Sequence, residues 1–554
     1  MQLVVRSAIT IRGRCFNGFH ELGGLVPIGQ RRLCPIEGDF VMSYTRRDIL
    51  KAGLTASAGS LIGNASSRAA VKTDGAETAH PPRNQFQPTW NSLRTVPSPQ
   101  WLRDAKFGIY THWGVYAVPA FGKNATWYIH NVYWKPDSPE RKHHETTYGP
   151  LEKFGYKEFI PMFTGEKFDA DEWADLFHRA GARFAGPVAE HHDGFSMWNT
   201  KYSEWNAVRM GPKRDVVGEL AKSIKKQGMK FVTAFHHAEN WFFFPTTDKR
   251  YDCADPRYSG LYGPIHEQGA LPDKAFLDKW QAKIVEVMDN YDPDLLWFDF
   301  GLELVQEDYK KEMLAYYFNK AVQEKKDVTV TYKRHDLVPM VGVDDLELGQ
   351  EREMTYNDWI TDSSVDNQGA WGYVRGAGFK SVDNLVDNLV DRVSKNGYLL
   401  LNVGPKPDGT IPDEAKERLL GLGKWLETNG EAIYGTTPWL IAAEGPTQLD
   451  KVGPFNENNE LKFTAQDIRF TSKDNVLYAT ALDWPGERIV IKSLAPRGRT
   501  WAGLYPSEIV SITMLGDDKE LKWEMTKEGL VVQTPAVKPG DYAFTFKITR
   551  KRPF

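Results

Sequence analysis

The chain has 554 residues with 41% apolar and 13% aromatic content, which allows more than one packed core. Lys and Arg total 69 against 73 Asp and Glu, a formal charge of −4, and this balance argues against a nucleic-acid partner, which would need a basic surface. Three cysteines are too few for a disulfide framework, and no run of residues reaches the roughly 18 to 20 apolar residues of a membrane-spanning helix.

The amino-terminal region has the pattern of an export signal. The run MSYTRRDILKAG begins at Met42, and its twin arginines, residues 46–47, precede an uncharged stretch of small and apolar residues at 52–67. This order is typical of a twin-arginine signal. An amphipathic first helix with a chance arginine pair is the alternative. We therefore expect residues 1–70 to be an upstream extension with a start codon assigned too early, followed by a signal for export to the bacterial periplasm or medium.

A regular alternation of β-rich and helical stretches follows. Residues 71–100 are polar and rich in Pro and Ser, a linker composition. Within 101–438, helices are predicted after Asp169, a candidate N-cap, and over residues 382–393, where apolar side chains share one face. The β-rich runs are KFGIYTHW (106–113), FAGPVAEHH (184–192), KFVTAFHH (230–237), DLLWFDF (294–300), DVTVTY (327–332) and YLLLNVG (398–404). This pattern predicts an α/β fold with a parallel sheet, and its length and spacing favour a (β/α)8-type barrel over a doubly wound sheet. The first strand is not followed by a Gly-rich phosphate loop, which argues further against the doubly wound sheet.

The pattern changes to period-two strands and turns over residues 439–554. The runs are LYATALDWP (477–485), IVIKSL (489–494), SITML (511–515), LVVQT (530–534) and YAFTFKI (542–548). They predict a C-terminal antiparallel β-sandwich. We expect it to pack against the barrel, with sugar binding as the alternative role.

Polar and ionisable residues lie where four predicted barrel strands end, and functional side chains of a β/α barrel gather at the carboxyl ends of its strands. These residues are His112, Trp113, His191, His192, Asp193, His236, His237, Glu239 and Asp299. Because side chains alternate along a strand, Leu295, Trp297 and Asp299 share one face. If the first two fill the barrel interior, Asp299 points into its mouth.

Two kinds of site fit these strand ends. Five histidines could supply imidazole ligands to a metal ion, but the two residues of an adjacent histidine pair face opposite ways on a strand and cannot easily chelate one ion. Alternatively, imidazoles hydrogen-bond to the hydroxyls of a sugar, Trp127 and Trp198 stack on its apolar faces, and two carboxyl groups flank the bond that is cut. The isolated Asp299 on the fourth strand favours the sugar pocket.

Five sequence blocks between about residues 90 and 440 carry a resemblance to a known family. They are FGIYTHWGVYAVPAFG (107–122), FTGEKFDADEWADLFHRAGA (163–182), AEHHDGFSMWNTKYSEWN (189–206), LLWFDFG (295–301) and NGYLLLNVGPKPDGTIP (396–412). Together they resemble the signature blocks of family 29 glycoside hydrolases, the retaining α-L-fucosidases. The resemblance implies a barrel with a C-terminal sandwich, a fucosylated glycan or glycoside as substrate, and no cofactor. It also implies double displacement by an Asp nucleophile and a Glu acid/base.

The resemblance also assigns roles to residues of this chain. Asp299 matches the nucleophile position. His112, Trp127, His191 and His192 match positions that bind the fucosyl hydroxyls and ring, and the alternative for each is a core histidine or a packing tryptophan.

Three positions depart from the family pattern or extend it. Thr126 stands where the family has a Glu, so one substrate contact is missing or comes from elsewhere. Phe235 stands at the position of a family Tyr, with His236 beside it as a candidate replacement donor. Trp371, in the run Trp-Gly-Tyr, is predicted as a further substrate contact.

The acid/base does not fall on the position that many family members use. There a Glu follows a Trp, whereas here Ile360 follows Trp359, and an aliphatic side chain cannot carry a proton. Other members have a Glu-Arg-Gly twelve residues before that Trp, and Glu347 begins a Glu-Leu-Gly at this spacing. We predict Glu347 as the acid/base, with Glu351 and Glu353 in reserve; the alternative makes all three solvated loop carboxylates. As an acid, Glu347 needs a pKa raised toward about 6 or 7 by burial or by the charge of Asp299.

Three functions are therefore open, and an exported retaining α-L-fucosidase leads. The second is a related exo-glycosidase of other sugar preference, or a sugar-binding barrel that has lost its acid/base; Ile360 and Thr126 motivate it. The third is a metal-dependent hydrolase on the same barrel.

Overall fold

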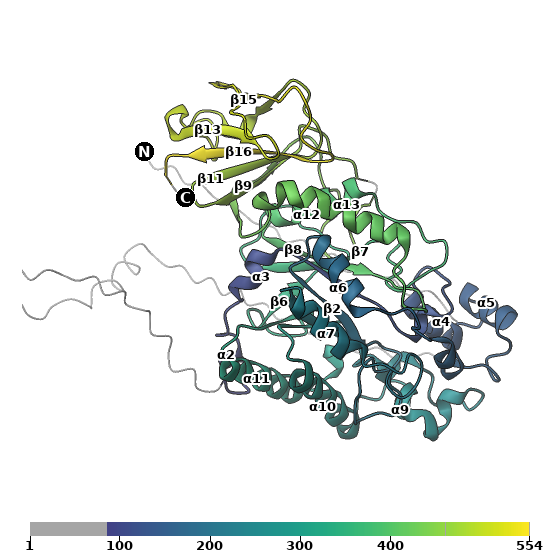
Figure 1. The fold of residues 1–554 in the computed structure, drawn as a ribbon. Coiled ribbons are helices and arrows are strands. Elements are labelled where there is room, and N and C mark those ends of the chain that lie inside the picture. Colours follow the sequence, from purple (N-terminus) through teal and green to yellow (C-terminus); the bar gives the residue numbers. More distant parts are fainter. Residues whose placement is uncertain (1–85, 460, 553–554) are drawn as a thin grey trace, which may run out of the picture. The chain divides into compact units, whose positions relative to one another are not determined.

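The computed structural model describes residues 86–459 and 461–552, so the predicted upstream extension, the export signal and the first half of the predicted linker lie outside the described residues. Eight parallel strands close into a barrel in the order β1 to β8 (Figure 1), which confirms the predicted fold class. The strands are β1 (Phe107–Thr111), β2 (Phe184–Glu190), β3 (Lys230–Phe235), β4 (Leu295–Phe298), β5 (Thr329–Lys333), β6 (Val343–Asp345), β7 (Trp359–Ser364) and β8 (Gly397–Val403).

Helices alternate with these strands and cover the barrel (Figure 1). The long ones are α6 (Ala170–Arg179), α7 (Val216–Lys226), α10 (Lys274–Tyr291), α11 (Glu307–Glu324), α12 (Val382–Ser394) and α13 (Asp413–Asn429). Shorter ones are α2 (Trp90–Leu93), α3 (Gln100–Ala105), α4 (Tyr128–Trp134), α5 (Pro139–Thr147), α8 (Asn240–Phe243) and α9 (Ser259–Tyr262). Asp169 caps α6 as predicted, because its carboxylate accepts hydrogen bonds from the backbone of Asp171 and Glu172. No described helix is long and apolar enough to cross a bilayer.

The structure differs from the expected linker over residues 86–100. Helix α2 lies in this stretch, and Phe86 and Trp90 pack against the barrel core. The backbone N–H of Phe86 donates to the side chain of Asn319 on α11, at 2.6 Å. This stretch is therefore part of the barrel domain, although its composition resembles that of a linker.

The barrel has an apolar interior below its mouth. Leu295 and Trp297 of β4 belong to this interior cluster, together with Val343 of β6, Ile360 of β7 and Leu400 of β8. All five side chains are buried. The predicted alternation along the fourth strand is therefore correct, and it directs Asp299, the residue after β4, upward to the mouth.

Two antiparallel sheets follow the barrel. One has the strand order β13-β16-β11-β10-β9 and the other β12-β15-β14. The strands are β9 (Thr437–Glu444), β10 (Ile468–Lys473), β11 (Val476–Ala481), β12 (Arg488–Ile491), β13 (Ile509–Met514), β14 (Trp523–Thr526), β15 (Gly529–Gln533) and β16 (Phe544–Arg550). One apolar cluster draws on both sheets, with Phe470 and Phe546 from the first and Ile491 and Leu530 from the second, as the predicted sandwich requires.

Candidate active site

A cavity of about 430 Å³ lies at the carboxyl ends of the barrel strands, and we call it the mouth cavity. Its lining combines imidazoles, carboxyl groups and aromatic rings. The lining residues are His112, Asn124, Thr126, Trp127, His191, His192, His236, Glu239, Trp297, Asp299, Phe300, Glu303, Arg334, Glu347, Asp362, Trp371 and Phe455. The eight leading site residues predicted from sequence are all among them.

Three buried imidazoles form the floor of this cavity. His112 Nδ1 lies 2.8 Å from the side-chain oxygen of Asn402, and His112 Nε2 lies 3.2 Å from His236 Nε2. Burial lowers the pKa of His112 to about 4 and moves the pKa values of His191 and His236 well below the usual histidine range. The three rings are therefore neutral near pH 7, and neutral imidazoles can both donate to and accept from hydroxyl groups.

His191 and His192 both line the mouth cavity, so the expectation that they face opposite ways was wrong. Strand β2 ends at Glu190, and the strand alternation no longer applies to the two residues after it. Their rings lie 4.2 Å apart, centroid to centroid. By contrast, His236 and His237 do diverge, since His237 Nε2 points to the carbonyl oxygen of Trp280, 3.2 Å away, outside the cavity.

Asp299 is held charged at the mouth of the barrel. Its Oδ2 lies 3.4 Å from His192 Nε2 and 3.7 Å from His236 Nε2, and its side chain is 12% exposed. Burial acts to raise the pKa of Asp299, but the hydrogen bond from His192 and the charge of Lys333 outweigh it, so that the pKa lies below the usual aspartate value. The same contact raises the pKa of His192 against the effect of its burial.

Glu347, unlike Asp299, is protonated at neutral pH. Burial raises its pKa to about 8, with Asp362 and Asp299 adding to the shift and Lys333 opposing it. Lys333 Nζ lies 3.3 Å from Glu347 Oε2, 2.9 Å from Asp362 and 3.3 Å from Asp345. The single buried ammonium of Lys333 thus lies among three carboxyl groups. It does not keep Glu347 ionised at neutral pH.

Some residues predicted from sequence lie outside the mouth cavity. Glu351 and Glu353 do not line it, and Glu353 is exposed. Trp198 was expected to stack on a sugar, but it is fully buried and its indole N–H donates to Glu286 at 2.9 Å. Phe235 packs in the outer core with Phe298, so His236 alone of that pair faces the cavity.

Sequence reasoning missed several functional candidates. Lys333 ends the run VTVTYK of β5, and a charged residue closing an alternating apolar strand was the available signal. Asp362 lies in β7, which was not predicted as a strand. Phe455 comes from the connection between β9 and β10, more than fifty residues past the predicted barrel strands, and no local pattern pointed to it.

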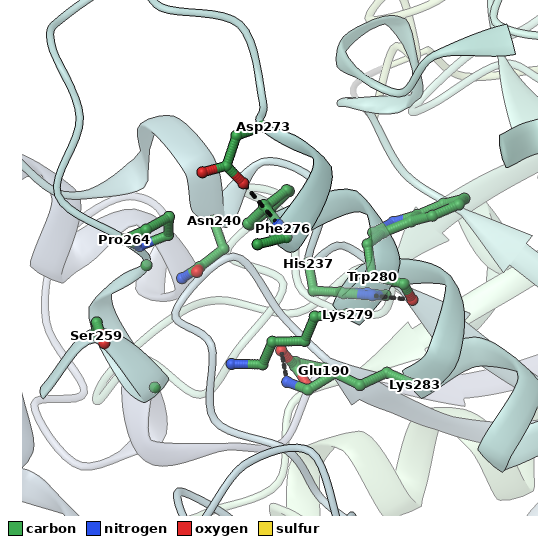
Figure 2. Close-up of a pocket in the computed structure, with 13 residues that line it drawn as sticks. Glu190, His237, Asn240, Ser259, Pro264, Asp273, Phe276, Lys279, Trp280 and Lys283 are labelled. Atoms are coloured by element: carbon green, nitrogen blue, oxygen red, sulfur yellow. Dashed lines mark hydrogen bonds and ion pairs between the residues drawn. The ribbon is translucent and has the colours of Figure 1, made fainter.

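A second pocket lies next to the carboxyl ends of β2 and β3, where α9 and α10 complete its walls (Figure 2). Its buried ion pair joins Glu190 to Lys283, with Nζ 2.6 Å from a carboxylate oxygen. Burial and the charge of Lys283 lower the pKa of the neighbouring Lys279 to about 8. None of the pocket's residues lines the mouth cavity, and the Glu190–Lys283 pair fixes the end of β2 directly before His191.

Comparisons with known proteins agree with this geometry. The Alpha-L-fucosidase family matches residues 75–431, and the Alpha-L-fucosidase C-terminal domain matches residues 461–549. The tissue alpha-L-fucosidase of Rattus norvegicus is 31% identical over 482 residues, which cover 84% of this chain and 93% of the relative. The plasma alpha-L-fucosidase of Homo sapiens is 31% identical over 476 residues, which cover 81% of this chain and 89% of the relative.

A solved structure gives the same result. The alpha-fucosidase of Thermotoga maritima in complex with fucose aligns with a TM-score of 0.67 at 32% identity, covering 84% of this chain and all of the other. A β/α barrel with carboxyl groups among imidazoles at its mouth, followed by a β-sandwich, fits a glycoside hydrolase, and the comparisons show that class. Within that class, the chain belongs to the α-L-fucosidase family, glycoside hydrolase family 29.

Proposed function

We propose that the protein releases terminal α-L-fucosyl residues from glycans by double displacement with retention of configuration. In this proposal Asp299 is the nucleophile and Glu347 the acid and base. The observation that supports it is the opposed ionisation of two carboxyl groups that line one cavity. Asp299 has a lowered pKa, whereas the pKa of Glu347 is raised to about 8.

The two steps use each carboxyl group twice. First, an Asp299 oxygen bonds to the anomeric carbon while the glycosidic C–O bond breaks, and Glu347 gives its proton to the departing oxygen. Then ionised Glu347 takes a proton from water, whose oxygen bonds to the anomeric carbon as the bond to Asp299 breaks. Each displacement inverts the anomeric centre, so the released fucose keeps the α configuration.

The neutral imidazoles supply the sugar contacts in this proposal. His112, His191 and His236 offer ring nitrogens that either donate to or accept from fucosyl hydroxyls. Trp127 and Trp371 line the same cavity and present apolar ring surface to the C–H groups and methyl group of fucose. His191 Nδ1 and His236 Nδ1 are buried without a partner among the described residues, as expected for groups that bind a ligand.

Azide rescue tests the two assignments together. Asp299→Ala should lose nearly all turnover of an aryl α-fucoside, and added azide should restore it with a β-configured fucosyl azide as product, because azide then attacks from the vacated side. Glu347→Ala should instead give the α-configured azide, since azide attacks the fucosyl-enzyme.

Glu353→Ala is the matched control, because this exposed carboxylate lies in the same loop but outside the cavity. It should keep wild-type rates with and without azide. Unchanged turnover in Asp299→Ala, or an α-configured azide from it, would refute the nucleophile assignment.

A metal-dependent hydrolase is the second candidate function. The observation that favours it is the close spacing of three histidine nitrogens in the mouth cavity. The ligand nitrogens of His112, His191 and His236 all lie within 4.8 Å of one another, a spacing that a transition-metal ion could bridge. Such an enzyme would lose activity on exhaustive chelation and regain it with Zn²⁺. Full activity after chelation, with no metal detected by elemental analysis, would exclude this alternative.

We also propose that the protein is exported. The support is the twin arginines at residues 46–47 followed by the uncharged stretch at 52–67.

A further inference from the structure

One wall of the mouth cavity includes Phe455, which belongs to the connection between β9 and β10, described over residues 445–459 and 461–467. This connection returns to the barrel and runs beside the loop that carries Glu347. Three backbone N–H groups of the connection donate to carbonyl oxygens of that loop, each at 2.7 Å: Gly453 to Gln350, Phe455 to Glu347 and Glu457 to Leu348. The connection is therefore attached directly to the residue proposed as the acid/base.

A buried ionic anchor fixes this attachment. Both oxygens of Glu457 are engaged, with Lys380 Nζ at 2.6 Å, the Arg392 guanidinium at 2.9 Å and the Ser363 hydroxyl at 2.9 Å. Burial acts to raise the pKa of Glu457, but the two cations outweigh it, so the carboxylate is charged. An anchor of this kind is costly to break, and it holds the neighbouring Phe455 in place.

Phe455 is exposed although it is a large apolar side chain on a fixed segment. Half of its surface, 51%, is accessible, and its ring stacks on that of Phe300 with a centroid distance of 6.1 Å and an interplanar angle of 19°. The Arg334 guanidinium lies 4.9 Å from the Phe300 ring centroid. Phe455 also has φ = 60°, a left-handed conformation that a residue with a side chain rarely adopts. The chain thus holds an apolar ring at the rim of the mouth cavity in an unfavourable backbone conformation.

We propose that Phe455 and Phe300 form a platform that binds the leaving group, and that this leaving group is a pyranose sugar with one apolar C–H face. The platform adjoins the acid/base, and the leaving oxygen has to lie at the acid/base, so the sugar that carries this oxygen lies over the two rings. Aromatic rings recognise pyranoses through such faces, whereas the polar rim with Arg334 and Glu303 offers partners to their hydroxyls. This inference rests on the proposed function, because it takes Glu347 as the acid/base.

The test compares two substrates of the Phe455→Ala variant. A fucosyl disaccharide has a sugar leaving group that can contact the platform, whereas fucosyl fluoride has only a fluoride ion. We expect kcat/KM for the disaccharide to fall about three- to tenfold more than kcat/KM for the fluoride. Phe455→Trp should restore the disaccharide rate, and Phe455→Leu, which keeps apolar volume without a planar face, should not.

A second measurement does not depend on how much of the variant folds. A retaining enzyme binds an added sugar acceptor at the leaving-group site: the acceptor hydroxyl gives its proton to Glu347, and its oxygen bonds to the anomeric carbon as the bond to Asp299 breaks. With fucosyl fluoride as donor, the ratio of transfer product to free fucose should fall about three- to tenfold in Phe455→Ala. Trp501→Ala is the control, because that ring is 96% exposed on the C-terminal domain and should leave both the ratio and the rate unchanged.

The outcomes separate the two hypotheses. If wild-type protein hydrolyses neither substrate, the proposed function fails and the platform fails with it. If it hydrolyses both through Asp299, but Phe455→Ala changes the two substrates equally and leaves the transfer ratio unaltered, the platform alone is refuted.

Discussion

At the scale of single residues, Lys333 acts on two carboxyl groups with different results. Its charge lowers the pKa of both Asp299 and Glu347. Asp299 also receives a hydrogen bond from His192, and the sum favours the carboxylate. Among the described residues, no second donor reaches the carboxyl group of Glu347, and Asp362 and Asp299 act on it with like charge, so burial and like charge prevail. The two ionisation states that a retaining mechanism needs therefore follow from neighbours rather than from the acids themselves.

The pH dependence of turnover follows from the pKa of Glu347. A general acid must be protonated, so kcat/KM for a fucosyl disaccharide should fall as pH rises through about 8. Fucosyl fluoride needs no proton on its leaving group, and its rate should lack this basic limb where cleavage of the fluoride limits the rate. Steady-state rates from pH 4 to 10 with both substrates would show the difference. The same basic limb for both substrates would contradict the role of Glu347.

Replacing Lys333 should shift the acidic limb of the pH profile of kcat/KM. Lys333→Met removes a charge that lowers the pKa of Asp299, so the nucleophile should become protonated at higher pH and the acidic limb should move upward. Loss of the buried cation also leaves Asp345, Asp362 and Glu347 without their counter-ion, at a cost of about 3–5 kcal/mol in the free energy of unfolding. Lys333→Arg keeps the charge and should keep the limb in place. An unmoved limb in Lys333→Met would contradict the electrostatic coupling.

At the scale of elements, the barrel could be predicted and part of its mouth could not. Helices α6 and α12 show their apolar faces and caps in the sequence, and six strands show apolar runs. Strand β6 has three residues, too few for a period, and β7 reads WITDSS, whose buried polar side chains resemble a loop. Asp362, in β7, was missed for this reason.

The proposed acid/base shows the limit of local patterns. Glu347 was selected by its spacing from Trp359 in a family resemblance, because nothing in its neighbourhood distinguishes it from Glu351 or Glu353. Only Glu347 of the three lines the mouth cavity, and its backbone carbonyl accepts a hydrogen bond from Phe455 of the distant connection. A contact between residues about a hundred positions apart leaves no signal in one sequence.

A buried ion pair joins helix α12 to strand β10 of the C-terminal domain. Arg469 Nε lies 2.6 Å from Asp391, and Lys395 lies 2.7 Å from the other oxygen. Burial acts to raise the pKa of Asp391, but the two cations outweigh it and lower the pKa to about 2. Because the folded pKa lies below the unfolded one, this stabilisation is present above pH 4 and is lost as pH falls toward 2.

Asp391→Asn should therefore destabilise the protein in a pH-dependent way. We expect a loss of about 2–3 kcal/mol in the free energy of unfolding at pH 7, and a smaller loss at pH 3, measured by urea denaturation. The matched control is Asp171→Asn, which removes an exposed pair with Lys226 at 2.9 Å and should cost less than about 1 kcal/mol. An equal loss at both pH values would show that the charge of Asp391 contributes nothing.

At the scale of the whole molecule, the barrel and the C-terminal sheets depend on each other. The indole N–H of Trp425 on α13 donates to the backbone carbonyl of Ala543, at 2.9 Å, and the ion pair of Asp391 and Arg469 joins α12 to β10. The connection between β9 and β10 completes the mouth cavity with Phe455. The C-terminal domain therefore contributes one wall of the mouth cavity, and Glu457 next to that wall neutralises two buried cations of the barrel, Lys380 and Arg392.

The contacts between the barrel and the C-terminal domain would form before export if the chain uses the twin-arginine pathway, which carries folded proteins. The described residues contain a single cysteine, Cys253, a buried free thiol, so this part of the chain requires no disulfide to form after export.

If the twin arginines direct export, Arg46→Lys combined with Arg47→Lys should leave uncleaved precursor in the bacterial cytoplasm, whereas the unmodified chain should yield processed protein in the periplasm or medium. Fractionation with immunoblotting and fucosidase assays of each fraction would measure the outcome. Processed protein outside the cytoplasm at wild-type levels in the Arg46/Arg47 variant would show that another route carries the chain.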